Sequence, residues 1–321
     1  MSEKIIIVFP GQGSQRVGMG QDIYKNHHVA REVFEEVDNT LNFQLSKIIF
    51  EGPEEDLTLT TNTQPALMAV SVAIVRVIEY ELKKKISSFA EIVMGHSLGE
   101  YSALCSLDSI SLKDTTSLLR IRGDSMQNSV KDIETSMVAV IGLDVIEVEK
   151  FLLENRLPKN EVCEIANDNC PGQVILSGTK KGVEIISEIL KDSGARSIIN
   201  LKVSAPFHSS LMKNASLIMQ ESLEPIEFKK FATNFISNVT ANFEGNLDRI
   251  KELLIKQVYS RVRWRESVIK STEENLKDIV EIGSGKVLSG MNKRIRKDLE
   301  IKSISNLGEI DSFFKTYKEI V

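Results

Sequence analysis

The most constraining feature of the sequence is Gly95-His96-Ser97-Leu98-Gly99, which directly follows the short apolar run Ile92-Val93-Met94. Glycine two residues on either side of a serine lets neighbouring backbone pass through a tight strand-to-helix turn without a Cβ clash. Residues 101–107 are compatible with a helix after that turn. An ordinary loop serine is the alternative, because the five-residue pattern alone is weak. The apolar strand before it and the helix after it favour a nucleophilic serine, and hence an acyl-transfer enzyme.

Such a serine needs a base, and the chain contains only four histidines. Two are adjacent within residues 21–38, where the apolar spacing predicts one amphipathic helix with both histidines on its surface. His96 adjoins Ser97 on a sharp turn, where adjacent side chains diverge, so we expect it to pack or to line the pocket. His208 lies in a segment rich in turn formers and is the predicted general base, although a lone loop histidine is usually solvated.

The amino-terminal segment predicts a second part of the site. Residues 4–9 form a near-continuous apolar run, typical of a strand buried on both faces of a parallel sheet. Loops in such sheets carry active sites beyond the carboxyl ends of the strands, so Gln12 is expected near the serine. We expect the amides of Gln12 and Leu98 to face the oxygen that becomes negative during acyl transfer. A nucleotide-binding loop is the alternative, but residues 10–15 lack the spaced glycines and the Gly-Lys-Ser/Thr ending.

Six segments stand in a fixed order between residue 5 and about residue 296. They are Phe9-Pro10-Gly11-Gln12-Gly13-Ser14-Gln15, Thr63-Gln64-Pro65-Ala66, Gly95-His96-Ser97-Leu98-Gly99-Glu100-Tyr101-Ser102-Ala103, Arg122-Gly123, Pro206-Phe207-His208 and Glu281-Ile282-Gly283-Ser284-Gly285-Lys286-Val287-Leu288. Together they resemble the malonyl-CoA:acyl carrier protein transacylases of fatty-acid synthesis. The combination covers nearly the whole chain and is far more specific than any one segment.

The resemblance implies a ping-pong reaction. A serine takes malonyl from malonyl-CoA as an ester and passes it to the phosphopantetheine thiol of an acyl carrier protein. By position, the resemblance assigns Ser97 as the nucleophile, His208 as its base and Gln257 as the residue whose backbone carbonyl orients the histidine. It assigns the oxyanion-hole amides to Gln12 and Leu98.

The resemblance also makes Arg122 the partner of the malonyl carboxylate. Malonyl and acetyl thioesters differ by one carboxylate, and the planar fork of arginine binds both carboxylate oxygens. Residues 112–130 predict a helix that places Leu118, Arg122 and Ser125 on one face, so the arginine is able to reach inward. Taken without the resemblance, a single helix arginine is more often a surface charge.

Four further residues are predicted to contact the substrate. Phe207 directly precedes the presumed base, and a bulky ring there resembles the malonyl-selective members of the wider acyltransferase family; packing under the loop is the alternative. Asn167 and Asn169 resemble an asparagine-containing loop on the active-site cleft, although three polar residues before a proline by themselves indicate only a turn. His96 is expected to line the same pocket.

The order of predicted elements indicates two structural units. Strands and helices alternate in a β-α-β-β-α-β-like order over residues 136–142, 145–155, 172–177, 181–193 and 195–203. We expect a ferredoxin-like subdomain over residues 131–203. It interrupts an α/β hydrolase-like catalytic domain with a parallel sheet, made of residues 1–130 and 204–321.

Composition narrows the function classes. The chain has 321 residues, of which 42% are hydrophobic and 26% charged, as in ordinary soluble proteins. Its longest apolar stretch, residues 65–75, is about eleven residues and too short to span a bilayer. The amino terminus lacks a secretory signal, and three cysteines with no metal-ligand pairing indicate reduced thiols, so a cytoplasmic enzyme is expected. The net charge of −5 argues against nucleic-acid binding. We expect no metal and no cofactor, coenzyme A being part of the substrate.

An acidic carrier protein requires a basic patch on this net-acidic chain. The densest cluster consists of Lys286, Lys293, Arg294, Arg296 and Lys297, although a solvated helix face explains each residue equally well. Three alternative functions remain open. They are a stand-alone acyltransferase that serves a polyketide pathway, an acyl hydrolase that acts on carrier proteins, and a catalytically silent carrier-binding module. Arg122 argues against the general hydrolase, which has no use for a carboxylate anchor.

Overall fold

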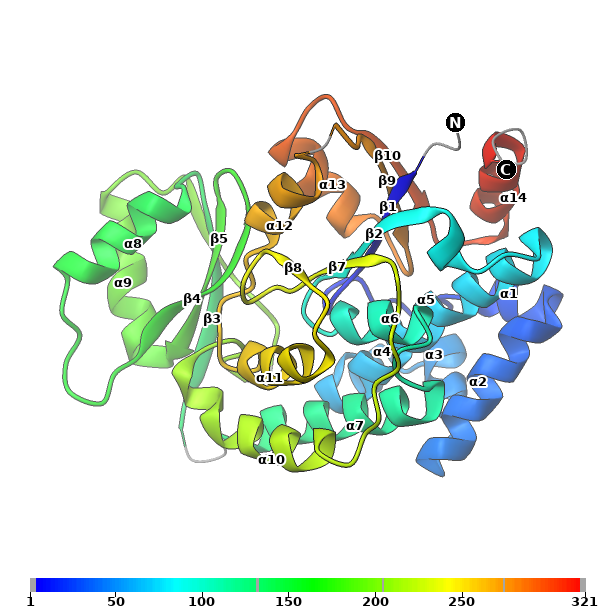
Figure 1. Cartoon of the computed structure of the whole chain (residues 1–321). Helices are drawn as coiled ribbons and strands as arrows, with labels where there is room; N and C mark the ends of the chain where they lie inside the picture. The colour runs from blue at the N-terminus through cyan, green and yellow to red at the C-terminus, as the bar shows by residue number, and fades with distance from the viewer. Residues whose placement is uncertain (1–3, 131–132, 204, 274, 318–321) are drawn as a thin grey trace.

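A six-stranded sheet forms the centre of the computed structural model, which describes residues 4–130, 133–203, 205–273 and 275–317 (Figure 1). The strands lie in the order β10-β9-β1-β2-β7-β8. Their bounds are β1 Ile5–Phe9, β2 Ala90–Gly95, β7 Asn234–Ile236, β8 Phe243–Glu244, β9 Asp278–Ile282 and β10 Glu300–Ile304. All neighbouring strands pair parallel except β7 and β8. This arrangement confirms the predicted α/β fold with a parallel sheet.

The two faces of this sheet pack into separate apolar cores. Ile5, Ile7 and Phe9 of β1 belong to the larger core, together with α5 (Thr60–Leu82). Ile6 and Val8 belong to a second core, built with α12 (Trp264–Ser271) and α13 (Val287–Ile295). Figure 1 shows these helices on opposite sides of the sheet. Successive side chains of a strand point to opposite faces, so the continuous apolar run at the amino terminus supplies both cores.

The remaining helices of this part surround the sheet. They are α1 Gln21–Asn26, α2 His28–Leu41, α3 Leu45–Glu51, α4 Glu54–Thr58, η1 Ile86–Ser88, α6 Gly99–Ser106, α7 Leu112–Asn128, η2 Ser210–Met212, α10 Lys213–Leu223, α11 Leu247–Gln257 and α14 Leu307–Tyr317. The single helix predicted over residues 21–38 is wrong. The backbone at His27 is extended (φ −123°, ψ 122°) and separates α1 from α2. Both helices bury apolar side chains in the same core, so their combined spacing imitates that of one helix.

A second, antiparallel sheet forms the smaller unit. Its elements follow in the order β3 Thr135–Ile141, α8 Val145–Glu154, β4 Cys163–Cys170, β5 Gln173–Thr179, α9 Lys180–Asp192 and β6 Ser197–Asn200. The strand order β4-β5-β3-β6 and the β-α-β-β-α-β sequence are those of a ferredoxin-like fold. We propose that this unit is the inserted subdomain. The two predicted boundary positions, residues 131 and 204, lie outside the described residues.

The asparagine-containing segment is a strand and not the predicted loop. Residues 167–169 belong to β4, which pairs with β5 through two register shifts. Asn167 also forms an isolated parallel bridge with Val262 of the large unit. Asparagine and aspartate are poor strand formers, and contacts with both units override that local preference here.

Contacts along β4 join the two units. The Asp168 N–H donates to the Val262 carbonyl at 2.9 Å, and the Val262 N–H donates to the Ala166 carbonyl at 2.8 Å. The buried Asp168 carboxylate accepts two hydrogen bonds from the Arg265 Nε, both at 3.0 Å, and forms an ion pair with its guanidinium. This junction holds the end of β4 against the carboxyl edge of the large sheet.

Candidate active site

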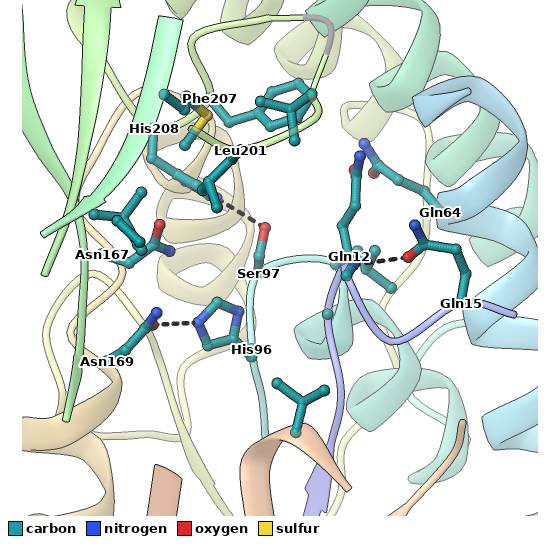
Figure 2. A pocket seen from close by; sticks show the side chains of 18 of the residues that line it. Gln12, Gln15, Gln64, His96, Ser97, Asn167, Asn169, Leu201, Phe207 and His208 are labelled. Carbon is teal, nitrogen blue, oxygen red and sulfur yellow. Dashed lines mark hydrogen bonds between the residues drawn. The ribbon is translucent and has the colours of Figure 1, made fainter. Parts of the chain in front are cut away.

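A cavity of about 440 Å³ opens between the two units. Nine of the ten predicted site residues line it, and Figure 2 shows most of them facing one another across it. They are Gln12, His96, Ser97, Leu98, Arg122, Asn167, Asn169, Phe207 and His208. The tenth, Gln257, lies buried behind the cavity at the end of α11. The fold therefore brings all of the predicted residues to one place.

Ser97 lies at the tip of the turn between β2 and α6. Its backbone is in the left-handed region (φ 53°), which a residue other than glycine adopts only under constraint. A Cβ atom at position 95 would overlap the backbone of Gly99, and one at position 99 would overlap the Phe9 carbonyl. Both glycines of the pattern are therefore required by the close packing of this turn.

Ser97 and His208 meet although 111 residues separate them in the chain. The His208 Nδ1 lies 2.8 Å from the Gln257 backbone carbonyl, which only accepts, so this nitrogen carries the proton. The His208 Nε2 then accepts from the Ser97 Oγ at 2.8 Å (Figure 2). Burial, followed by the charge of Arg122, lowers the pKa of His208 to about 3. The imidazole is therefore neutral, and its Nε2 lone pair faces the serine hydroxyl.

Arg122 is the least solvated cation of the site, with a side chain only 1% exposed on the inner face of α7. It donates to the Gln64 Oε1 at 2.6 Å, the Gln257 Oε1 at 2.9 Å and the Ser97 Oγ at 3.1 Å. Its Nε has no hydrogen-bond partner, and no ion pair of the described residues includes this guanidinium. A buried cation with neutral partners beside a nucleophile favours an anionic group on the acyl chain.

The predicted oxyanion-hole residues also face the cavity. Ser97 donates its own N–H to the Asn238 Oδ1 at 2.7 Å, so this amide is occupied. The backbone N–H groups of Gln12 and Leu98 donate to no acceptor within the part of the chain that the structure describes. Two unpaired amides near a nucleophile suit an oxygen that gains negative charge.

His96 does not contact the serine hydroxyl through any hydrogen bond of the described residues. Its Nε2 lies 3.0 Å from the Asn169 Oδ1 (Figure 2), and its ring packs against Trp264 with centroids 5.6 Å apart. Burial lowers the pKa of His96. The contacts of His96 are thus those of a residue that lines the cavity and joins it to β4.

Sequence reasoning missed three side chains of the site. Gln64 lies in the motif Thr63-Gln64-Pro65-Ala66, but the sequence did not predict that its side chain accepts a hydrogen bond from Arg122. Asn238 and Glu100 meet the serine turn from behind, where Asn238 donates its Nδ2 hydrogen to the Gly95 carbonyl at 2.7 Å. Asn238 follows β7 and is 141 residues away from Ser97, so no local pattern indicates its role.

The predicted basic cluster is largely engaged by its own chain. Lys286 pairs with Glu309, Arg296 pairs with Asp298, and Lys293 donates to the Leu299 carbonyl. Arg294 donates to the Gln173 Oε1 at 2.9 Å and to the Pro171 carbonyl at 2.7 Å, at the rim of the cavity. Lys297 is exposed.

Two further features concern residues 4–130, 133–203, 205–273 and 275–317. In these ranges no three His, Cys, Asp or Glu side chains are grouped as metal ligands. None of the helices within them has the length and apolar character needed to cross a membrane. The three cysteines are free and buried.

A serine and a histidine in hydrogen-bond contact at the edge of an α/β sheet are the arrangement that serine-dependent acyltransferases use. The sequence model of the acyl transferase domain family matches residues 6–311, and the chain belongs to this family, which confirms the resemblance predicted from the sequence. The chain is 42% identical over 316 residues to the malonyl CoA-acyl carrier protein transacylase of Bacillus subtilis, with 98% of each protein covered.

Two solved structures show the same similarity. An acyl-carrier-protein S-malonyltransferase from Bartonella henselae is 44% identical, with a TM-score of 0.92 and coverage of 98% of this chain and 99% of that one. A malonyl-transacylase in complex with its type II PKS acyl-carrier protein is 36% identical, with a TM-score of 0.92 and the same coverage. The similarity therefore extends over both structural units.

Proposed function

We propose that this enzyme transfers malonyl from malonyl-CoA to the phosphopantetheine thiol of an acyl carrier protein, through a malonyl ester on Ser97. The observation that carries the proposal is Arg122, a buried guanidinium with neutral partners and one nitrogen 3.1 Å from the Ser97 Oγ. A malonyl group on Ser97 brings its free carboxylate to this guanidinium. The names of the similar enzymes support the same substrate and acceptor.

In the first half-reaction, the Ser97 Oγ attacks the thioester carbonyl of malonyl-CoA and His208 Nε2 takes the serine proton. The amides of Gln12 and Leu98 stabilise the oxyanion of the tetrahedral intermediate. When the intermediate collapses, the C–S bond breaks and His208 returns the proton to the departing coenzyme A thiolate. Arg122 exchanges its hydrogen bond with the serine oxygen for one with the malonyl carboxylate.

In the second half-reaction, the thiol of the carrier protein gives its proton to His208 and attacks the serine ester. The C–O bond to Ser97 then breaks, and the serine oxygen takes back the proton. His208 can serve both halves because the Gln257 carbonyl keeps the proton on Nδ1 throughout. The chemistry of both half-reactions uses only side chains, backbone amides and the thioester, so we propose that the enzyme needs no metal or cofactor. We also propose that it works in the cytoplasm, because its three cysteines are free thiols, as is usual in a reducing compartment.

A loading and transfer assay tests this function. The purified chain is mixed with malonyl-CoA, and intact-protein mass spectrometry follows the malonyl adduct and its passage to purified carrier proteins. We expect an adduct on Ser97 that disappears when a phosphopantetheinylated carrier is added. Carriers from fatty-acid and polyketide pathways, tested side by side, identify the pathway. An adduct released only to water would instead support the acyl hydrolase, and no adduct would support the silent binding module.

Arg122→Ala should selectively weaken malonyl transfer. A charge-assisted hydrogen bond contributes about 1.5 to 3 kcal/mol, so kcat/KM for malonyl-CoA should fall by roughly 10- to 150-fold. Loading from acetyl-CoA should be retained or rise, because acetyl has no carboxylate to lose its partner. Arg120→Ala is the matched control on the same helix, since Arg120 contacts Thr61 and Asn62 instead. Equal losses for both acyl groups would make Arg122 a structural residue.

Phe207→Ser should relax the choice between malonyl and methylmalonyl. Phe207 is 7% exposed, lines the cavity and directly precedes His208. A methyl group on the α carbon competes with the ring for space, and crowding of a packed site costs about 1 to 3 kcal/mol. We expect the methylmalonyl to malonyl ratio of kcat/KM to rise about tenfold. An unchanged ratio in a folded variant would place the selectivity elsewhere in the cavity.

His208 should remain neutral well below the ordinary pKa of histidine. Its pKa falls from 6.5 to about 3 because burial and Arg122 disfavour the imidazolium. NMR titration of the four histidines, with a His208→Ala spectrum for assignment, should show no protonation of this ring at pH 5.5. The unfolded chain takes up this proton near pH 6.5, so the stability contributed by neutral His208 is lost as pH falls from 6.5 toward 3. A titration near pH 6.5 would contradict the buried geometry.

A further inference from the structure

A carboxyl group lies directly beneath the serine turn, at Glu100 in the first turn of α6. Its side chain is 0% exposed. One oxygen, Oε1, accepts from the Asn238 N–H at 2.5 Å, and the other, Oε2, accepts from the Gln257 Nε2. Both partners are donors, an arrangement that suits an ionised carboxylate. Burial raises the pKa of Glu100 to about 8, against the lowering effects of the Asn238 N–H, the charge of Arg122 and the Gln257 amide. The ionised form is favoured by the contacts themselves, because both carboxyl oxygens face donors.

Through Gln257, the Glu100 carboxylate is connected to the Arg122 guanidinium. The Gln257 Nε2 donates both to Glu100 and to the Ser97 carbonyl, the latter at 3.0 Å. Its Oε1 accepts from Arg122 at 2.9 Å. Only the NH₂ group of an amide can donate to a carboxylate or to a backbone carbonyl, so Glu100 and the Ser97 carbonyl together determine which way this amide points. The amide oxygen must then face Arg122.

Through Asn238, the Glu100 carboxylate is connected to the turn that carries Ser97. Its N–H is held by Glu100, and its side-chain Oδ1 accepts the Ser97 N–H at 2.7 Å. A residue other than glycine at φ 53° stays there only when several contacts hold it. The Glu100 carboxylate thus lies one hydrogen-bonded residue away from both the turn and the guanidinium.

We propose that Glu100 is a positioning residue that aims Arg122 at the acyl group by fixing the orientation of the Gln257 amide. This rests on the proposed function, in which Arg122 binds the malonyl carboxylate. Glu100 itself touches neither the substrate nor the serine hydroxyl. Its action is therefore indirect, and it is specific to acyl groups that carry a carboxylate.

The substitution Glu100→Gln separates this role from simple support of the fold. Glutamine has nearly the same shape but offers one oxygen and one NH₂ group. Because the Asn238 N–H requires the oxygen, the NH₂ group must face Gln257. The Gln257 amide can accept from this NH₂ group only by turning its oxygen toward position 100, which also breaks the Gln257 Nε2 hydrogen bond to the Ser97 carbonyl. The NH₂ group of Gln257 then faces Arg122, donor against donor, and the guanidinium loses an acceptor that held it.

The test is a double-variant cycle of malonyl loading on Ser97, measured by intact-protein mass spectrometry. The four proteins are the wild type, Glu100→Gln, Arg122→Ala and the double variant. We expect Glu100→Gln to lower kcat/KM for malonyl-CoA by about tenfold when Arg122 is present. In the Arg122→Ala background, Glu100→Gln should lower kcat/KM by less than about threefold, because the guanidinium that Glu100 positions is absent. Acetyl loading should change little.

Equal fold-losses in both backgrounds would overturn the proposal, because Glu100 would then act without Arg122. Glu281→Gln is the matched control. Glu281 is also 0% exposed and accepts from the amides of Leu288 and Ser289, at 3.1 and 2.7 Å, and not from Gln257. Any loss that it causes should be the same in both backgrounds.

A second variant covers the case in which Glu100→Gln does not fold. Gln257→Met removes the side-chain amide but keeps the backbone carbonyl that orients His208. We expect it to show the same dependence on Arg122, and an equal loss with and without Arg122 would overturn the proposal. Wild-type loading, measured in the same experiment, keeps the two claims apart. If the wild type takes no malonyl, the proposed function fails; if it does and the cycle shows no coupling, only the role of Glu100 fails.

Discussion

Replacing Ser97 with alanine should abolish malonyl loading while leaving the fold intact. The serine oxygen is the atom that forms the ester. Among the described residues, Ser97 is the only one whose hydroxyl contacts both the His208 and the Arg122 side chains. The hydroxyl lies at the tip of a turn, so its removal leaves no cavity in the core. Intact-protein mass spectrometry with malonyl-CoA measures the adduct, and thermal unfolding measures the stability.

Ser102→Ala is the matched control for this prediction. Ser102 lies on α6, one turn beyond the nucleophile, and its buried Oγ has no hydrogen-bond partner in the described residues. Removing an unpaired buried hydroxyl is close to neutral for stability. This variant should load malonyl at the wild-type rate. Normal loading of Ser97→Ala would refute the mechanism, because the adduct would then have formed on another residue.

Replacing His208 with alanine should slow loading by 100-fold or more. A positioned general base contributes about 10²- to 10⁴-fold, and the serine hydroxyl is a weak nucleophile without it. The Nε2 lies 2.8 Å from the Ser97 Oγ, and the ring is already neutral, so its loss removes the proton acceptor directly. Single-turnover loading from malonyl-CoA measures the rate of the chemical step.

His96→Ala distinguishes the two histidines of the site. His96 contacts Asn169 and Trp264, so we expect a smaller loss of loading from altered packing of the cavity wall. The base assignment would be wrong if His96→Ala were crippling while His208→Ala changed the rate by only a few-fold. Both variants should be compared by thermal unfolding, because His208→Ala removes the shorter hydrogen bond to the Gln257 carbonyl and leaves only the Ser260 N–H, at 3.4 Å.

The serine turn, the amino-terminal strand and the inward face of the arginine helix were predictable because local rules decide them. The glycines around Ser97 are required by contacts within a few residues and with one neighbouring strand. A continuous apolar run predicts a strand covered on both faces, and Ile5–Phe9 is such a strand. Helical spacing placed Arg122 on the buried side of α7.

Other elements were predicted wrongly where distant contacts override local preference. Asn167 and Asn169 read as a turn, yet pairing with β5 and bridging to Val262 make this segment a strand. The break at His27 was hidden because helices on both sides bury apolar residues in the same core. Periodicity reports burial, and it does not report where the backbone bends.

The sequence alone indicates the serine, the histidine and the arginine that we propose carry the chemistry, because short-range sterics and six ordered motifs specify them. Only the tertiary structure decided how these groups are held. The Ser97 to His208 contact spans 111 residues, and the Gln257 side chain, at the end of α11, joins Ser97 and Glu100 of one segment to Arg122 of another. Such contacts depend on the order of the strands and on how the small unit packs against the large one. Both are set by the burial of apolar surface over the whole chain and not by any local sequence pattern.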